Sequence, residues 1–407
     1  MQNVGIIAEY NPFHLGHAYQ LNEIRKRCPD AGIIAVISGS FTQRGEPALL
    51  DKWERAELAV KGGCDLVLEL PFAFACRSAQ DFARGGVQLL AGLGIVDTLA
   101  FGAETGRLEL LVKAAGSIDT PSFQQQLHAK IKEGLAYAAA LEVLLGQEGT
   151  GDFIREPNNI LALEYLRALK DYPTLSPLLI QRRGAAYHSE DLQSPLSSAS
   201  ALRRALYEGR LERAIAESSA PSATAQKLME IVKEELPNMA KLYPALQLAL
   251  LRQSDGELKH ICGMDEGLEN RLREAATAHC YEEFIKKAVS RRYPATRLQR
   301  LAIHLLLSLV RETAAAFDKT GPLYARLLAA GPLGKELLKE IKQQSSLPLI
   351  AKTSQFLNSA TRKKNLQELS PLQQMLAFDT WATELRELTL PRPRQVNDFN
   401  RSPLFID

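Results

Sequence analysis

The stretch Val4-Gly5-Ile6-Ile7-Ala8-Glu9, followed by Asn11-Pro12-Phe13-His14-Leu15-Gly16-His17, decides the fold. Its apolar run predicts a buried strand that leads through a turn into a helix. Because His14 and His17 are three residues apart, both imidazoles lie on one face of the first helical turn. The same turn presents free backbone N–H groups and the positive end of the helix dipole. The sequence therefore predicts an anion site with two added donors, suited to the phosphates of a nucleotide.

A pair of histidines at this spacing has simpler explanations, since such rings also cap helices and bind metal ions. Two features of the context favour phosphate binding. Gly16 lets a ligand approach the backbone closely. A strand followed by a turn and a helix is also where open α/β sheets bind their ligands, beyond the carboxyl ends of the strands.

Further short apolar runs predict four more strands, at residues 33–37, 66–70, 98–101 and 178–180. Helical patterns lie between them, for example at residues 52–61 and 79–93. This alternation predicts a mostly parallel sheet with helices on both faces. Right-handed crossovers place the loops after the strands at one edge of the sheet. We therefore expect His14, Ser38, Pro71 and Gly102 to converge there.

The pattern changes near residue 205, after which amphipathic helices dominate. We expect helices at residues 223–236, 267–277, 296–317, 322–330 and 371–388, with a short strand within 347–350. The segment 391–394 is predicted to begin an irregular tail. The chain is thus expected to have an α/β domain over residues 1–205 and a mainly helical domain over residues 206–407.

The composition describes an ordinary globular protein without a strong overall charge. Of the 407 residues 46% are hydrophobic and 24% charged, and the net charge is +2, so any nucleic-acid site must be local. Five cysteines without CxxC spacing argue against a disulfide framework and a structural zinc site. No signal region and no apolar run of about 20 residues is present, which predicts a cytoplasmic protein with no membrane partner.

Three other groups of residues are candidates for nucleotide binding, each with a plain structural alternative. Arg182 and Arg183 follow the fifth predicted strand. They are candidates to bind phosphate, and the alternative is an ordinary pair of solvent-exposed arginines at the end of that strand. Ser198 and Ser200 open a helix that carries Arg203, as a second phosphate loop or an ordinary cap. The pair Asn158-Asn159 precedes a helical run, and capping explains one asparagine but not two. Gly102 lets the backbone approach adenine or ribose.

One segment of the second half has the composition of an RNA-binding surface. Residues 286–300 contain a tyrosine, no acidic residue, and six basic residues: Lys286, Lys287, Arg291, Arg292, Arg297 and Arg300. A solvated helix face usually balances its charges within a few residues, and this segment does not. Phosphate contacts together with an aromatic side chain are what RNA binding requires.

The N-terminal motif resembles the HxGH signature of the nucleotidyltransferase superfamily, relatives of the class I aminoacyl-tRNA synthetases. Over most of its length the chain resembles, more narrowly, the bacterial tRNA(Met) cytidine acetate ligases. The blocks that carry this likeness include Gly5–His14, Ser38–Pro47, Asp51-Lys52-Trp53, Leu68–Pro71, Phe101–Glu104, Asn158–Leu161, Arg182–Ala185, Ser198–Arg203, Glu266–Asn270 and Arg292–Arg297. Ser40 stands where that family usually has Asn, and Ser200 stands where Thr is common.

The resemblance implies a Rossmann-like nucleotidyltransferase domain and an ATP-dependent ligase. Such an enzyme activates acetate as acetyl-adenylate and transfers the acetyl group to N4 of the wobble cytidine of elongator tRNA(Met), forming N4-acetylcytidine. Mg²⁺ is expected with the triphosphate. We predict no metal ion held by the protein itself and no stable protein partner. The helical domain is the expected tRNA-binding part.

The resemblance also assigns residues to roles. His14 and His17 are the expected catalytic residues, as donors to the phosphate oxygens. The expected ATP contacts are Ile7, Ala8, Glu9, Tyr10, Asn11, Pro12, Phe13, His14, Leu15, Gly16, His17, Ala18, Tyr19, Gln20, Gly102, Asn158, Asn159, Arg182, Arg183, Ser198, Ser200 and Arg203. The basic residues of segment 286–300 are the expected RNA contacts.

Two other functions use the same motifs. A small-molecule adenylyltransferase of coenzyme metabolism would carry the same histidine pair, but it would not need a helical domain with a local basic segment. An RNA-binding protein with a degenerate nucleotide pocket would not need His14, Gly16 and His17 intact.

Overall fold

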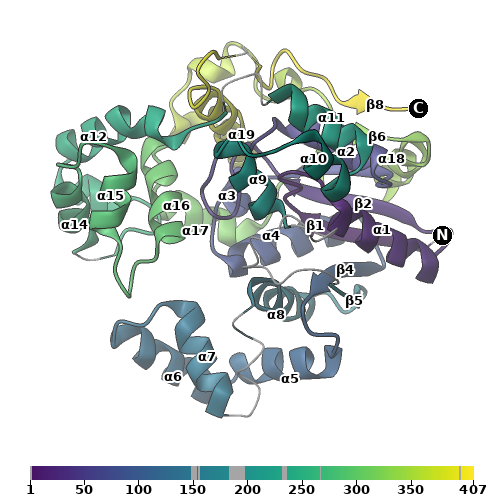
Figure 1. Cartoon of the computed structure of the whole chain (residues 1–407), viewed down its shortest axis with the longest axis horizontal. Coiled ribbons are helices and arrows are strands. Elements are labelled where there is room, and N and C mark those ends of the chain that lie inside the picture. Colours follow the sequence, from purple (N-terminus) through teal and green to yellow (C-terminus); the bar gives the residue numbers. More distant parts are fainter. Residues whose placement is uncertain are drawn as a thin grey trace.

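The computed structural model describes residues 2–147, 154, 156–182, 198–231, 236–265, 267–393 and 396–407. Its centre is a sheet with the strand order β5-β4-β1-β2-β3-β6-β7, and β8 pairs with β6 (Figure 1). The strands are β1 (Asn3–Ala8), β2 (Gly32–Ser38), β3 (Leu66–Leu70), β4 (Thr98–Ala103), β5 (Ser176–Gln181), β6 (Ala325–Ala330), β7 (Leu349–Ile350) and β8 (Leu404–Phe405).

The five strands predicted in the first half are confirmed, and β1 to β5 all pair in parallel. Successive residues of β2 enter two different cores, Ile33 with α1 and α2 on one face and Ile34 with α4 and α8 on the other. Both faces are covered, which explains why these strands are apolar at nearly every position.

Helices enclose the sheet and form a separate group beside it. The helices of the first part are α1 (Leu15–Arg27), α2 (Lys52–Lys61), α3 (Phe72–Ala75), α4 (Ala79–Gly92), α5 (Leu108–Ile118), α6 (Pro121–Lys132), α7 (Tyr137–Gln147), α8 (Pro157–Leu169), α9 (Ala199–Tyr207), α10 (Arg213–Ser219) and α11 (Ser222–Ile231). Those that follow are α12 (Tyr243–Arg252), α13 (Asp255–His260), α14 (Leu268–Ala275), α15 (Tyr281–Ala288), α16 (Ala295–Leu306), α17 (Arg311–Thr320), α18 (Pro332–Gln344) and α19 (Pro371–Glu387). Figure 1 places α12 and α14–α17 together at one side of the sheet.

The predicted helix at residues 322–330 is wrong, because Ala325–Ala330 forms strand β6, antiparallel to β3. A short run of alanine and leucine has no period that separates a buried strand from a helix. The sheet therefore takes strands from both sides of residue 205, including the short strand expected within 347–350. A division of the chain into domains at residue 205 stays a prediction.

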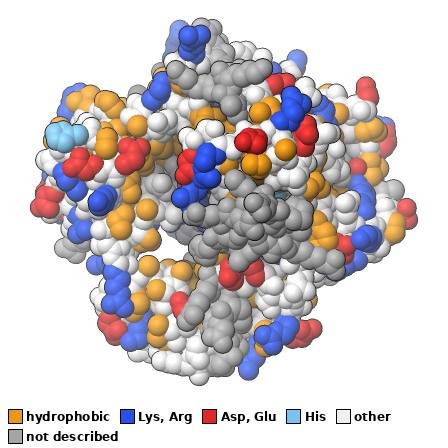
Figure 2. Space-filling view, viewed as in Figure 1, with side chains coloured by type: hydrophobic (Ala, Val, Ile, Leu, Met, Phe, Trp, Pro, Cys, Tyr) orange, Lys and Arg blue, Asp and Glu red, His pale blue; other side chains and the backbone are white. Residues whose placement is uncertain are grey.

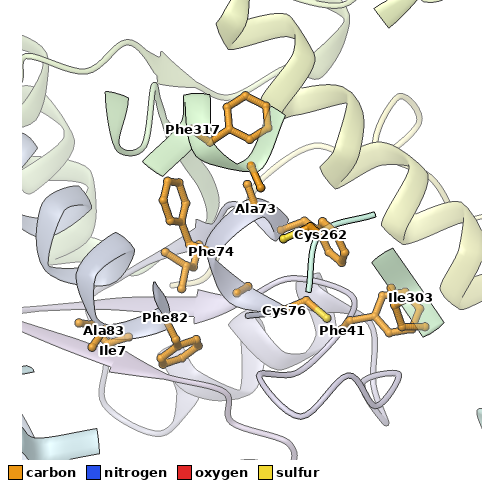
Figure 3. Close-up of a cluster of buried hydrophobic side chains, with 14 of the residues drawn as sticks. Ile7, Phe41, Ala73, Phe74, Cys76, Phe82, Ala83, Cys262, Ile303 and Phe317 are labelled. Atoms are coloured by element: carbon orange, nitrogen blue, oxygen red, sulfur yellow. The ribbon is translucent and has the colours of Figure 1, made fainter. Parts of the chain in front are cut away.

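The predicted helix at residues 296–317 is two helices, α16 and α17. Ser308 has a left-handed backbone with φ 53°, and the Leu309 N–H returns to the carbonyl of His304 at 2.9 Å. The apolar pattern continues through this turn, which explains why it was not visible in the sequence. The first and second halves of the chain share one core, which contains Phe74 and Cys76 from the first half and Phe317 from the second (Figure 3).

The C-terminal tail contributes a buried carboxylate to the sheet. Asp398 lies 2.5 Å from Lys52 Nζ and 2.5 Å from Arg326 Nη1. Glu69 completes the cluster, 2.8 Å from Lys52 and 3.1 Å from Arg326. All four side chains are nearly fully buried. This buried ion cluster joins α2, β3, β6 and the tail, so Lys52 has a structural role there.

Among the described residues, no helix is both long enough and apolar enough to cross a bilayer.

Candidate active site

The two histidines of the N-terminal motif stack at the start of α1. Their ring centroids are 3.9 Å apart and their planes differ by 32°. His14 is the N-cap, and its Nδ1 accepts a hydrogen bond from Gly16 N at 2.9 Å. His17 Nδ1 accepts from His14 N at 3.3 Å. Because a neutral imidazole carries one proton, each ring holds it on Nε2, the nitrogen left to donate to a ligand.

Both rings are neutral at physiological pH. Burial, together with the positive charges of Arg182 and Arg203, lowers the pKa of His14 to about 3. Burial also lowers the pKa of His17 well below its usual value, together with His14 and Arg182. The pair can therefore serve as neutral hydrogen-bond donors, which is what the predicted role at phosphate oxygens requires.

Gly16 has a local reason to be glycine that the sequence did not show. A Cβ at this position would lie 2.7 Å from Cε1 of His14, so a larger residue would displace the capping ring. Beneath the turn, Tyr10 and Phe13 pack against His17 with ring-centroid distances of 4.8 and 5.5 Å. Tyr10 and Phe13, which belong to the predicted ATP-binding residues 7–20, are buried. They thus support the turn His14–His17, here called the histidine turn, from its buried side.

Arg203 reaches the histidine turn from α9. Its Nη1 donates to the Asn11 carbonyl at 2.8 Å, and its Nη2 pairs with Glu46 at 3.1 Å. Ser198 is the N-cap of α9, with its hydroxyl accepting from Ala201 N at 3.1 Å, and Ser200 is in the first turn. The structure therefore brings Arg203 to the predicted phosphate site and uses Ser198 as a cap.

A second set of polar residues gathers after β4. The Asn159 side-chain oxygen accepts from the N–H groups of Glu104 and Thr105 at 3.0 and 3.1 Å, which shapes this loop. Asn158 donates to Glu104 Oε1 at 2.5 Å, and Arg182 Nε lies 3.7 Å from the same oxygen. The Arg182 side chain also passes over Gly102, whose missing Cβ would sit 3.4 Å from it. Arg183 lies outside the described residues.

Glu104 and Glu46 are the residues of this site that the sequence did not single out. Each is a carboxylate that holds one of the predicted arginines, Arg182 or Arg203. Glu104 belongs to the quoted block Phe101–Glu104, which was the available signal. Its partners come from a different helix and strand, so spacing alone did not reveal its contacts.

The six predicted RNA contacts do not form one uniform surface. Lys286, Lys287, Arg291 and Arg292 are exposed, at and after the end of α15. Arg297 pairs at 2.7 Å with Asp265, which lies outside the segment in the sequence but close to it in space. Arg300 is largely enclosed and donates to the Gln43 carbonyl at 3.1 Å. Basic and acidic side chains are interspersed across the face in Figure 2.

Comparisons with known proteins agree on one family. The protein-family model described as HIGH Nucleotidyl Transferase matches residues 1–400 of this chain. A tRNA(Met) cytidine acetate ligase from Syntrophomonas wolfei is 39% identical over 421 residues, covering 99% of each chain. One from Clostridium perfringens is 34% identical and covers 100% of each.

Solved structures of Thermotoga maritima TmcAL match the whole fold at 28% identity, covering 100% of both chains. The TM-score is 0.87 for the form bound with α-thio ATP and 0.89 for an apo form. The parallel α/β nucleotidyltransferase fold is thereby confirmed. This chain belongs to the HIGH nucleotidyl transferases and, among them, to the family of tRNA(Met) cytidine acetate ligases.

Proposed function

We propose that this protein is an ATP-dependent ligase that acetylates N4 of the wobble cytidine of elongator tRNA(Met) in the cytoplasm. The observation that carries the proposal is the neutral histidine pair at the N-terminus of α1, with both Nε2 positions left for a ligand. The names of the relatives and the ATP analogue bound to TmcAL supply the substrates.

The first step is adenylation of acetate. A carboxylate oxygen of acetate attacks the α-phosphorus of ATP, the bond to the β-phosphate oxygen breaks, and pyrophosphate leaves. Negative charge grows on the α-phosphate oxygens, where His14 and His17 are proposed to donate through Nε2. Arg203, beside the same turn, offsets the charge of the departing phosphates.

The second step is acyl transfer. The N4 amine of the cytidine attacks the carbonyl carbon of acetyl-adenylate, AMP leaves, and the nitrogen loses a proton. The wobble base must therefore reach the α-phosphate side of the histidine turn.

Mg²⁺ is proposed to enter with the triphosphate, whose charge must be offset. The two carboxylates nearest His14 and His17 are already engaged. Glu46 pairs with Arg203, and Glu9 accepts from Gln43 N at 2.6 Å. These side chains do not fit a metal site of the protein's own, so the triphosphate itself would hold the ion.

Product analysis without tRNA tests the adenylation step. With ATP and acetate alone, the protein should form AMP, pyrophosphate and acetyl-adenylate, which anion-exchange chromatography separates. Omitting acetate should abolish AMP formation. ADP and inorganic phosphate as products would indicate an acyl-phosphate route and would refute the proposed reaction.

The exposed part of the basic segment is proposed to bind tRNA. Reversing two charges there, with Arg291→Glu and Arg292→Glu, should weaken tRNA binding and reduce its salt dependence, because fewer counterions are released. Acetate-dependent AMP formation should survive. Binding is measured by filter retention at several salt concentrations.

The matched control carries the same change of charge on α18, with Lys339→Glu and Lys342→Glu at exposed positions. This control should bind tRNA like the wild type. If the Arg291 and Arg292 variant lost AMP formation while remaining folded by circular dichroism, these arginines would belong to the catalytic site and the assignment would be wrong.

A further inference from the structure

The Glu104 carboxylate has one engaged oxygen and one that is not. Oε1 accepts from Asn158 at 2.5 Å and lies 3.7 Å from Arg182 Nε. Oε2 is buried and has no hydrogen-bond partner among the described residues. A buried carboxylate oxygen without a donor is unfavourable, so this position calls for a donor from a ligand.

The place of Glu104 in the sheet says which ligand is near. β4 lies directly beside β1 although β2 and β3 come between them in the chain. From β1 the sheet extends through β2 and β3 on one side and through β4 and β5 on the other, so the strand order reverses between β1 and β4. Open α/β sheets bind ligands in the crevice at such a reversal. His14 follows β1 and Glu104 follows the end of β4, so both lie at the carboxyl ends of two neighbouring parallel strands. The influence of Arg182 on the pKa of His14 places the two groups within electrostatic reach.

The chemistry of the carboxylate restricts which part of the ligand it contacts. Acetate and the ionised triphosphate are negative and carry no donor, so both would repel Oε2. The nucleoside part of ATP has three kinds of donor, the 2′-hydroxyl, the 3′-hydroxyl and the exocyclic amine of adenine. Of acetate and the parts of ATP, only the nucleoside can donate a hydrogen bond to this oxygen.

We propose that Glu104 is a nucleotide-selecting residue, whose Oε2 accepts a hydrogen bond from a donor on the nucleoside of ATP. This inference rests on the proposed use of ATP. Asn158 and Arg182 then have a second task, since they hold the carboxylate by its other oxygen and offset its charge. The loop geometry set by Asn159 fixes where the carboxylate points.

Equilibrium binding of nucleotides tests the proposal without relying on turnover. Calorimetry would give the Kd of ATP, 2′-deoxy-ATP, 3′-deoxy-ATP and purine riboside triphosphate for the wild type and for Glu104→Ala. The wild type should bind one of the three analogues about 10-fold or more weakly than ATP, the size of a hydrogen bond to a charged group. Glu104→Ala should bind ATP about 10-fold more weakly and no longer distinguish that analogue from ATP.

A purely structural role gives a different result. If Glu104 only positions Asn158 and Arg182, its loss weakens all four nucleotides by the same factor and keeps the wild-type preference, which would overturn the proposal. Glu109→Ala, at an exposed position in the first turn of α5, is the matched control and should bind all four as the wild type does.

Glu104→Gln identifies the donor. Asn158 donates to Oε1 and Arg182 lies beside it, so the amide of Glu104→Gln should keep its carbonyl oxygen there and present its N–H₂ in place of Oε2. A ribose hydroxyl can accept from this N–H₂, so the variant should regain most of the ATP affinity if the partner is ribose. The adenine amine only donates in this setting, and the variant should then resemble Glu104→Ala. A wild-type protein that selects among the nucleotides but forms no AMP with acetate would refute the proposed function and leave the assignment of Glu104 standing.

Discussion

Replacing His17 with alanine is expected to lower the rate of acetyl-adenylate formation roughly 10²–10³-fold, equivalent to about 3–4 kcal/mol of barrier, while the Kd for ATP stays near its wild-type value. The donor at His17 Nε2 gains most when charge develops on the α-phosphate oxygens, so its loss falls on the transition state. Single-turnover kinetics measure the rate, and calorimetry measures the Kd.

His17 is the better of the two histidines for this experiment. The His14 ring also caps α1 through its contact with Gly16 N, so its removal would mix a loss of helix stability with a loss of catalysis. His128→Ala, at an exposed position on α6, is the control and should retain full activity. A folded His17→Ala protein that formed acetyl-adenylate at the wild-type rate would exclude His17 from the reaction.

Replacing Lys52 with methionine is expected to destabilise the protein by roughly 3–5 kcal/mol. Its ammonium lies 2.8 Å from Glu69 and 2.5 Å from Asp398, and all three side chains are buried. Without it, two buried carboxylates would share the single charge of Arg326. The free energy of unfolding from urea titrations measures the effect.

Lys61→Met is the matched control on the same helix. Lys61 pairs with Glu57 at 2.6 Å, but both side chains are substantially exposed, and such pairs contribute about 0.5 kcal/mol or less. If the two variants unfolded at the same urea concentration, the buried ion cluster would not be the anchor that holds the C-terminal tail.

Sequence patterns predicted those parts of the fold that local physics determines. The runs at β1 to β5 are apolar, short and bounded by turns, so their state and parallel pairing followed. β6 did not follow, because its alanine and leucine residues suit a helix and only pairing with β3 decides otherwise. The break at Ser308 is followed by a hydrogen bond from Cys262 N to the Leu309 carbonyl, and Asp398 pairs with Lys52 and Arg326. Both features therefore depend on contacts that are distant in sequence.

The residues of the candidate site also divide into those that local sequence patterns reveal and those that depend on packing. The histidine pair, Arg182, Arg203 and the two asparagines were predicted from motifs and resemblance. In the structure Arg203 donates to the Asn11 carbonyl, and Asn158 and Arg182 both face Glu104. The carboxylates Glu46 and Glu104 were missed because an isolated acid has no informative spacing. Arg300 is half-buried and donates to the Gln43 carbonyl, a contact that its charge in the sequence did not reveal, and its role in RNA binding stays a prediction.

The central claim is that acetate, activated on this site, ends on a cytidine of tRNA. The most direct measurement incubates the pure protein with ATP, carbon-labelled acetate and total tRNA, then digests the RNA and locates the label by mass spectrometry. The account predicts label only as N4-acetylcytidine at the wobble position of elongator tRNA(Met), and only when ATP is present. Label at another nucleoside, on another tRNA, or on no RNA at all would contradict it.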